Sequence, residues 1–465
     1  MKLQFPKDFK FGVADADLQV VGERFAVSEE QSSPTMWTHF AKNSHKVFNN
    51  DTPEPGIDRY HRWEEDVELM KAMGAKHFRT SVSMARLMNP DGTVNSSAAT
   101  WYINYFKALK KADITTYATL YHWELPMWLF EKGGWLNRET SEVLAKHATL
   151  VAETLGEYID EYFLFNEPWC AAILSYFHGN HAPGEQNTKH ALEAAHNILL
   201  GIGLSHQALE KIDKNLKIST VFNTEPAYAN SADPKDILAA KYADGYFNRW
   251  FMDPIYIGKY PEDMLELYGS NVPKFTKEEM NTIKIGNKLH AFGHNYYCGK
   301  IVEYDPEAEL KFKVIIRKEG ETNDLGWPIF QAPTYPDGLY DMLSQVYFSY
   351  KNYGLKRIYI PENGMALEST WDGKSSIVRD ARRIDYYTEH LRQVYKAIQR
   401  GIPVEAYFAW TIMDNYEWAE GYREESRFGL IYVDRKSMKR VWKESAHWYK
   451  DLIRTNSITV PENKA

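Results

Sequence analysis

Two glutamates stand at the ends of short apolar runs, where a buried strand would pass into a loop. Glu167 closes the run in EYFLFNEPWC (residues 161–170), and Glu362 closes the run in RIYIPENGM (residues 357–365). If both runs are strands of one barrel, the two carboxylates face each other at one mouth. Hydrolysis of a glycosidic bond requires such a pair, because one carboxyl group protonates the leaving oxygen while the other attacks the anomeric carbon or activates water.

Each motif alone also fits a structural role. Pro168 is suited to the first position of a helix, which would make Glu167 its cap. Asn363-Gly364 is a strong turn dipeptide, and a single histidine such as His122 is usually a hydrogen-bonded core residue. Only the arrangement of the strand ends as a whole can favour catalysis, so the elements that position them decide the matter.

Metal and nucleotide sites are poorly supported. His178 and His181 lie in FHGNHAPG, where glycine and proline favour a loop over a pair of metal ligands. The run GIGLSH at Gly201 has too few glycines for a nucleotide loop. Cys170 and Cys298 are the two cysteines of the chain, and their spacing fits neither a disulfide framework nor a zinc site. We therefore expect no metal and no cofactor.

Composition and charge narrow the class of protein. The chain has 465 residues, with 44% hydrophobic, 25% charged and 14% aromatic residues. The net charge of −8 argues against a nucleic-acid partner, which needs a basic face. No apolar segment resembles a signal peptide or a membrane span, so the expected location is the cytoplasm with no membrane partner. The aromatic content fits a large core or a site that stacks sugar rings.

Apolar runs alternate with helical patterns along the whole chain, as expected for parallel strands covered on both faces. The predicted strands are Phe9–Ala14, His77–Ser83, Thr115–Trp123, Tyr162–Glu167, Lys217–Asn223, Ala291–Tyr297, Arg357–Glu362 and Val404–Ile412.

Helix signals lie between these runs. Trp63, Val67, Met70 and Met73 recur at helical spacing, and Gly74 follows as a stop signal. Asp233-Pro234 is typical of a helix start, and a long amphipathic segment ends at Gly401. With no linker in the chain, eight strand–helix pairs predict an α/β protein. We expect a single (β/α)₈ barrel domain over residues 1–465, with long βα loops.

In such barrels the strand ends form the catalytic face. Polar and aromatic residues able to contact a sugar lie in the predicted strands, at their ends or in the loops after them, namely Gln19, Arg79, His122, Asn166, Glu167, Asn295, Tyr297, Glu362, Trp410, Glu417 and Trp418. Strands 4 and 7 of a barrel this size allow a carboxylate separation of about 5–5.5 Å, which would give retention of anomeric configuration, although the sequence does not fix that distance.

The motifs resemble those of glycoside hydrolase family 1, the β-glucosidase family, along nearly the whole chain. FPKDFKFGVADADLQVVG is similar to the N-terminal signature of the family, and YHWELPMWLFEKGGWLN to its His-Trp loop. FNEPW resembles the acid/base motif, and YIPENGMA resembles the nucleophile motif, in which threonine usually stands at Pro361. AWTIMDNYEWAEGY and RFGLIYVD resemble the C-terminal sugar-binding block.

The resemblance implies a role for each residue. Glu167 would be the general acid/base and Glu362 the nucleophile, supported by Arg79, Asn295 and Tyr297. Glu167 must then stay protonated near neutral pH, which requires a raised pKa. Trp410 would form the floor of the −1 subsite, and Trp327 would stack on the leaving group. The residues that would hydrogen bond the sugar hydroxyls are Gln19, His122, Asn166, Glu417 and Trp418.

The same motifs limit the substrate. Phospho-β-glycosidases of the family carry a Ser…Lys-x-Tyr clamp where this chain reads EWAEGYREESRFG, and Glu417 would repel a 6-phosphate. Thioglucosidases replace the acid/base with glutamine, whereas this chain has Glu167. We therefore predict a retaining, exo-acting β-glucosidase that acts on unphosphorylated β-D-glucosides through a glycosyl-enzyme intermediate. A transglycosidase using the same intermediate, or a barrel that binds a glycoside without turning it over, remains an alternative.

Departures from the family pattern occur in four places. Val21 replaces a usual glutamate and Met84 a usual tryptophan, while GYREESRFG and FQAPTYPDG are longer than usual. We expect these changes in or near the mouth, where they would alter the preference for the aglycone. The expected partner is a small-molecule β-glycoside, and assembly into a homo-oligomer is compatible with the sequence.

Overall fold

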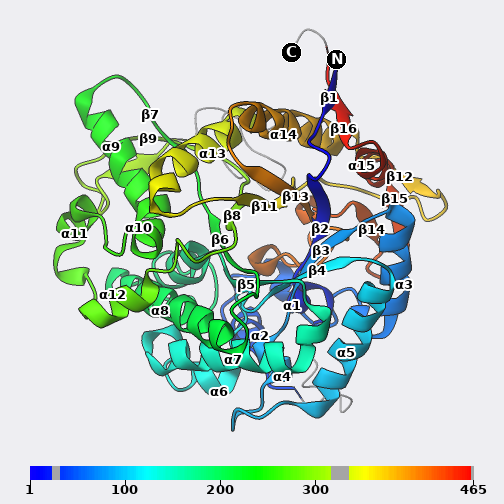
Figure 1. Ribbon diagram of the computed structural model, residues 1–465, viewed down its shortest axis with the longest axis horizontal. Helices are drawn as coiled ribbons and strands as arrows, with labels where there is room; N and C mark the ends of the chain where they lie inside the picture. Colours follow the sequence, from blue (N-terminus) through cyan, green and yellow to red (C-terminus); the bar gives the residue numbers. More distant parts are fainter. Residues whose placement is uncertain (23–31, 316–334, 462–465) are drawn as a thin grey trace.

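The computed structural model describes residues 1–22, 32–315 and 335–461 (Figure 1). Eight parallel strands close into a barrel in the order β11-β13-β2-β3-β4-β5-β6-β8, which confirms the predicted fold class. The strands are β2 (Lys10–Ala14), β3 (His77–Ser81), β4 (Thr115–Thr119), β5 (Glu161–Asn166), β6 (Ile218–Asn223), β8 (Phe292–Asn295), β11 (Ile358–Asn363) and β13 (Val404–Trp410).

Five predicted strands extend past the observed carboxyl-terminal ends, and β4 differs most. It ends at Thr119, whereas the apolar pattern suggested Trp123. Trp123, four residues beyond this end, has a left-handed backbone (φ 76°), which a regular strand does not accept, so the strand could not extend as far as predicted. His122 and Trp123 therefore belong to a loop at the mouth of the barrel.

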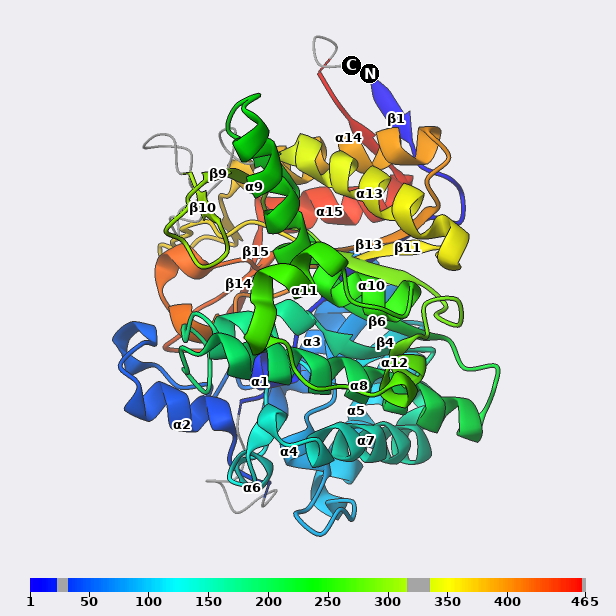
Figure 2. The same cartoon turned by 90° about the vertical axis from the view of Figure 1, so that its left-hand side faces the viewer.

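Helices surround the barrel (Figures 1 and 2). Predicted signals mark several of their ends: Gly74 (φ 78°) follows α3, Gly401 (φ 80°) lies just beyond α14, and the Asp233 side chain accepts from the Lys235 N–H at 2.8 Å to cap α9. The longer helices are α3 (Arg59–Met73), α5 (Ser96–Lys111), α7 (Glu139–Leu155), α8 (Thr188–Ile212), α9 (Pro234–Asp244), α13 (Pro336–Tyr350), α14 (Ala381–Gln399) and α15 (Glu444–Thr455).

Side chains from the strands fill the barrel. Tyr117 of β4 lies 5.1 Å from Phe408 of β13 between ring centroids and 6.5 Å from Tyr359 of β11, so these rings meet across the interior. Gly12 of β2 leaves room for Phe408, since a Cβ there would lie 2.4 Å from the ring. The Arg79 guanidinium lies 5.6 Å above the ring of Phe163. A layer of aromatic side chains inside the barrel thus packs directly beneath Arg79, a polar residue of the site.

Described residues outside the barrel strands and their helices form three small sheets, two of them in the βα loops. One sheet has the order β10-β9-β7 and another β12-β15-β14, while β1 pairs with β16 and brings the two ends of the chain together (Figure 1). These strands are β1 (Lys2–Gln4), β7 (Ala227–Ala229), β9 (Lys300–Tyr304), β10 (Phe312–Val314), β12 (Ile377–Val378), β14 (Ile431–Val433), β15 (Arg440–Lys443) and β16 (Ser457–Thr459).

Among the described residues, no helix contains an apolar stretch long enough to cross a bilayer.

Candidate active site

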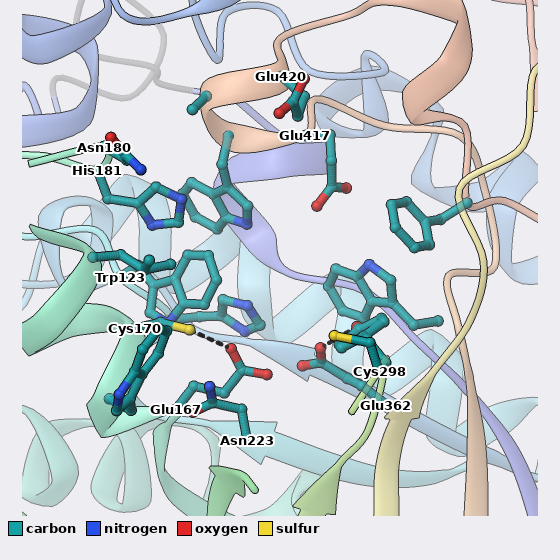
Figure 3. Close-up of a pocket in the computed structure, with 18 of the residues that line it drawn as sticks. Trp123, Glu167, Cys170, Asn180, His181, Asn223, Cys298, Glu362, Glu417 and Glu420 are labelled. Atoms are coloured by element: carbon teal, nitrogen blue, oxygen red, sulfur yellow. Dashed lines mark hydrogen bonds between the residues drawn. The ribbon is translucent and has the colours of Figure 1, made fainter. Parts of the chain in front are cut away.

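A cavity of about 620 Å³ opens at the carboxyl ends of the barrel strands (Figure 3). Its size suits a small ligand. The predicted site residues that line it are His122, Glu167, Tyr297, Glu362, Trp410, Glu417 and Trp418. Four others, Gln19, Arg79, Asn166 and Asn295, are buried and hydrogen bonded to residues of this lining or to one another. Trp327 lies outside the described residues.

Glu362 is buried between a cation and a hydroxyl group. Arg79, with no exposed surface, donates through Nη1 to Glu362 Oε1, and the Tyr297 hydroxyl donates to Glu362 Oε2 at 2.8 Å. Arg79 Nε is held by the Thr119 hydroxyl at 2.9 Å, so the guanidinium has a fixed orientation. The charge of this carboxylate is balanced by a direct ion pair.

Glu167 has different partners. Asn295 Nδ2 donates to its Oε1 at 2.6 Å, and the Cys170 thiol donates to its Oε2 at 3.1 Å. Both donors are neutral. Burial, together with the negative charge of Glu362, raises the pKa of Glu167 to about 8. One carboxyl group therefore favours its acid form while the other is paired with a cation, and this is the asymmetry that acid-assisted displacement needs.

The hydrogen bond of Asn295 differs from the expectation that this residue supports the nucleophile. Its amide contacts Glu167 and the Asn166 side chain (Oδ1, 3.1 Å), and Tyr297, two residues later, is the one that reaches Glu362. β8 ends at Asn295, so Tyr297 lies beyond the strand, and the alternation of strand side chains does not say which carboxylate it will meet.

Asn166 connects the two carboxylates to His122. Its Oδ1 accepts from Arg79 Nη2 at 2.8 Å, and its Nδ2 lies 3.2 Å from His122 Nε2. Burial and the nearby Arg79 hold the pKa of His122 well below its usual value, so the ring is neutral. Because Asn166 presents an N–H to Nε2, that nitrogen is the acceptor and the ring proton lies on Nδ1.

Aromatic side chains form one wall of the cavity. His122 lies parallel to Trp410 and Trp418, at 5.7 and 5.9 Å between centroids, and Trp418 also packs against Trp123 at 4.9 Å. Flat apolar surfaces of this kind suit the C–H faces of a pyranose ring. His181 packs against Trp123 at 5.2 Å, and burial lowers its pKa to about 3, so it is a neutral part of this wall.

A third carboxyl group, Glu417, lies in the same cavity. Gln19 Nε2 lies 3.4 Å from its Oε2 and 2.7 Å from the Tyr416 carbonyl oxygen. Burial, and then the charge of Glu362, raises the pKa of Glu417 well above its usual value. The cavity therefore gathers these three carboxyl groups and several neutral donors, which suit the hydroxyl groups of a sugar.

The backbone is irregular where it presents these groups. The ladders break register between Phe163 and Asn166 in β5 and between Ile360 and Asn363 in β11, as bulges do when they redirect side chains. Glu167 has φ 53°, a left-handed value that is unfavourable for a non-glycine residue and is typical of functional sites.

One of the two structural interpretations of these motifs coexists with the site, whereas the turn expected at Asn363-Gly364 is absent: Asn363 is the last residue of β11 and no turn is formed at Gly364. Pro168 does open a helical turn, in which the Glu167 carbonyl accepts from the Ala171 N–H at 3.2 Å. Gly364 is required by close approach, because a Cβ there would lie 1.9 Å from the carbonyl oxygen of Trp410. A helical turn thus follows Glu167, whereas Glu362 lies within β11 just before a close approach of the backbone.

Two of the departures from the family pattern lie away from the cavity. Val21 and Met84 are 1% exposed and pack in the hydrophobic core, so the expectation that they shape the mouth is not met. The longer GYREESRFG segment does reach the mouth through Arg423, which pairs with Glu420 at 2.9 Å.

Sequence reasoning missed several residues that line the cavity, among them Trp169, Cys170, Asn223, Glu225, Cys298 and Lys300. Lys300 Nζ lies 3.3 Å from Glu225 and 3.2 Å from Cys298 Sγ. Cys170 follows Glu167 by three residues in a helical turn, a spacing that could have indicated contact.

The described residues hold no group of three or more His, Cys, Asp or Glu side chains placed to bind a metal ion.

Comparison with known proteins agrees with this geometry. The family model for glycosyl hydrolase family 1 matches residues 1–458. The chain is 36% identical to β-glucosidase A of Thermotoga maritima over 98% of this chain and 99% of that protein, and 30% identical to the 6-phospho-β-glucosidase GmuD of Bacillus subtilis over 97% of each. The structure of the family 1 β-glucosidase from Thermotoga maritima in complex with isofagomine lactam matches with a TM-score of 0.91 and 34% identity, covering 98% of this chain and all of that one. The chain therefore belongs to glycosyl hydrolase family 1 and is a retaining O-glycosyl hydrolase.

Proposed function

We propose that this enzyme releases a terminal, unphosphorylated β-D-glucosyl residue from small β-glucosides. The observation that carries the proposal is the contrast between its two central carboxyl groups. Glu362 is paired with Arg79, whereas Glu167 has neutral partners and a raised pKa. This contrast is what a nucleophile and a general acid require of one cavity.

The proposed reaction has two steps. A Glu362 oxygen attacks the anomeric carbon from one face while Glu167 gives its proton to the departing glycosidic oxygen, which leaves as an alcohol. The covalent bond removes the negative charge of Glu362, so Glu167 loses a repulsive neighbour and ionises more readily. It then takes a proton from the water that attacks the intermediate, and the sugar is released with its original configuration.

The −1 subsite is assigned from the same cavity. Trp410 provides the floor, and the residues proposed to hydrogen bond the hydroxyl groups of the sugar are Gln19, His122, Asn166, Glu417 and Trp418. The nearly parallel rings of Trp410 and Trp418 beside His122, and the polar atoms at Glu417, support this assignment. Trp327 stays a prediction for the leaving-group side.

An unphosphorylated sugar is favoured despite the similarity to a 6-phospho-β-glucosidase. A phosphate carries at least one negative charge, and Glu417 stands where the resemblance expects a phosphate clamp to begin. Two of the cations at the cavity are already engaged, Lys300 with Glu225 and Arg423 with Glu420. A phosphorylated substrate would have to compete with these carboxylates.

A panel of p-nitrophenyl glycosides tests the proposal. We expect release from the β-glucoside that is insensitive to a chelator, with at least about 100-fold lower kcat/KM for the β-glucoside 6-phosphate, since an unpaired buried charge costs several kcal/mol. The α-glucoside should not react, because the nucleophile approaches from one face only. Preference for the phosphorylated sugar would overturn the proposal, and the β-galactoside and β-fucoside would define the tolerance of the subsite.

The pH dependence should depend on Glu167. Its acid form is needed in the first step, and its raised pKa of about 8 predicts that kcat/KM for an unactivated aryl glucoside holds through neutral pH and falls above about pH 8. With a 2,4-dinitrophenyl glucoside, whose leaving group needs no proton, most of this fall in kcat/KM at high pH (the basic limb) should disappear. The same limb with both substrates would assign it to another group.

Three further expectations stay predictions. A single domain is supported by barrel strands that run from Lys10 to Trp410 and by the pairing of β1 with β16. A cytoplasmic location and assembly into a homo-oligomer rest on the sequence alone. Transglycosylation differs only in the acceptor that meets the intermediate, and product analysis in the presence of added glucoside would measure its share.

A further inference from the structure

We propose that Cys170 is a positioning residue for the acid/base: Asn295 leaves the proton of Glu167 on Oε2, and the Cys170 thiol donates to that same oxygen once the proton has passed to the leaving group. The inference rests on the proposed acid/base role of Glu167. Cys170 is not among the residues proposed to contact the sugar, and its role would account for a neutral thiol beside the acid.

A chain of hydrogen bonds starting at Arg79 identifies the two oxygens of Glu167. Arginine can only donate, so the Asn166 atom 2.8 Å from Arg79 Nη2 is the carbonyl oxygen. That oxygen lies 3.1 Å from the Asn295 side chain, which must therefore present its NH₂ group. The same NH₂ group lies 2.6 Å from Glu167 Oε1. Oε1 is thus held as an acceptor, and the acid proton belongs on Oε2.

Cys170 occupies the other side of the carboxyl group. Its Sγ lies 3.1 Å from Oε2, and the side chain lines the cavity while being only 6% exposed (Figure 3). Burial, followed by the charge of Glu167, raises the pKa of the thiol well above its usual value, so the thiol keeps its proton throughout the working range. It is an S–H group in both states of Glu167.

The thiol has a different effect in each state. While Glu167 is an acid, the O–H of Oε2 is directed past a weakly accepting sulfur and is free to donate to the glycosidic oxygen. Once that O–H bond breaks and the proton passes to the leaving oxygen, Oε2 becomes anionic and accepts from the S–H. A weak, neutral donor stabilises this anion slightly without removing the raised pKa that a cation would abolish.

The other groups facing Glu167 interact with it electrostatically rather than through a hydrogen bond. They are the carboxyl groups of Glu362 and Glu417, the guanidinium of Arg79 and the hydroxyl group of Tyr297, while Glu225 faces Cys170. Cys170 and Asn295 are the described residues that hydrogen bond to the Glu167 carboxyl group itself.

The test compares Cys170→Ser, which keeps a donor, with Cys170→Val, which fills the space without one. We expect Cys170→Val to move the basic limb of kcat/KM upward by about half a pH unit, since the anion of Glu167 loses a donor. It should also lose about 3- to 10-fold in kcat/KM with phenyl β-glucoside and less than about 2-fold with the 2,4-dinitrophenyl substrate. Cys170→Ser should keep both properties near those of the wild type.

Cys298→Ala is the matched control, because Cys298 is also buried in this cavity but its sulfur contacts Lys300 and Glu225. It should change neither the basic limb nor the dependence on leaving group. Equal losses with all leaving groups in Cys170→Val, at an unmoved basic limb, would mean that Cys170 only fills space and would overturn the inference.

A readout without turnover separates this inference from the acid/base assignment. In protein labelled with ¹³C at glutamate carboxyl carbons, the Glu167 resonance is the one lost in Glu167→Gln. Its titration midpoint should rise in Cys170→Val and return in Cys170→Ser. A midpoint that does not move contradicts the positioning role, whereas a midpoint that moves while the basic limb of kcat/KM stays in place contradicts the acid/base role instead.

Discussion

Glu362→Ala is expected to lower kcat by at least about 10⁵-fold, because the variant has no atom that can form the covalent intermediate. The cavity is otherwise retained, since Arg79 keeps its hydrogen bonds to Thr119 and Asn166. The loss should be similar for activated and unactivated glucosides, because both need the same attack. Steady-state kinetics with the two classes of substrate measure it.

Azide then identifies the role of the missing group. A small anion can enter the space left by the side chain beside Arg79 and attack an activated β-glucoside directly. One displacement inverts the anomeric centre, so we expect partial recovery of turnover and an α-glucosyl azide, which NMR of the product distinguishes. A β-glucosyl azide, or no recovery at any azide concentration, would contradict the assignment of Glu362 as nucleophile.

Glu420→Ala is the control for a carboxylate of the same cavity. Glu420 lines the mouth and pairs with Arg423 at 2.9 Å, on side chains more than a quarter exposed. A partly exposed ion pair contributes little, so the variant should lose less than about 10-fold and show no response to azide. An azide response in this variant would mean that the rescue is not specific to the nucleophile position.

The architecture of the barrel was accessible from the sequence because its physical causes are local. Strands covered on both faces need near-continuous apolar runs, and helix ends need residues such as Asp233 and Gly74 whose side chain or backbone freedom closes the last turn. Both carboxylates were also accessible, since each follows directly on such a run. The parallel arrangement then places them at the same end of the barrel.

The contacts between site residues were not accessible, because they depend on small backbone irregularities. The bulges near Asn166 and Asn363 and the left-handed backbone at Trp123 redirect side chains by amounts that no periodicity records. Asn295 hydrogen bonds to Glu167, whereas the family resemblance implied that it supports the nucleophile Glu362. The expected position of Met84 at the mouth was wrong for a related reason: a substitution in a motif does not say which face of its element the residue occupies, and Met84 is a buried residue of the short helix α4 (Met84–Leu87).

The loss of kcat/KM in Glu167→Ala should depend on the leaving group of the substrate. With phenyl β-glucoside, whose oxygen needs a proton, kcat/KM should fall by about 10²- to 10⁴-fold, the usual contribution of general acid catalysis. With the 2,4-dinitrophenyl glucoside the first step should remain within about 10-fold of the wild type. The second step is slowed because no base activates water, so a burst of dinitrophenol should precede a slow steady state.

Azide should also act on Glu167→Ala, but the azide product should have the anomeric configuration opposite to that from Glu362→Ala. In Glu167→Ala the glucosyl-enzyme on Glu362 still forms, and azide attacks that intermediate from the face the leaving group vacated. Two inversions give a β-glucosyl azide, and the steady-state rate should rise until formation of the intermediate limits it. Uniform loss across leaving groups, without a burst, would mean that Glu167 has a structural role. Azides of opposite configuration from the two variants require one group on each face of the sugar, a result that a barrel binding glycosides without turnover could not give.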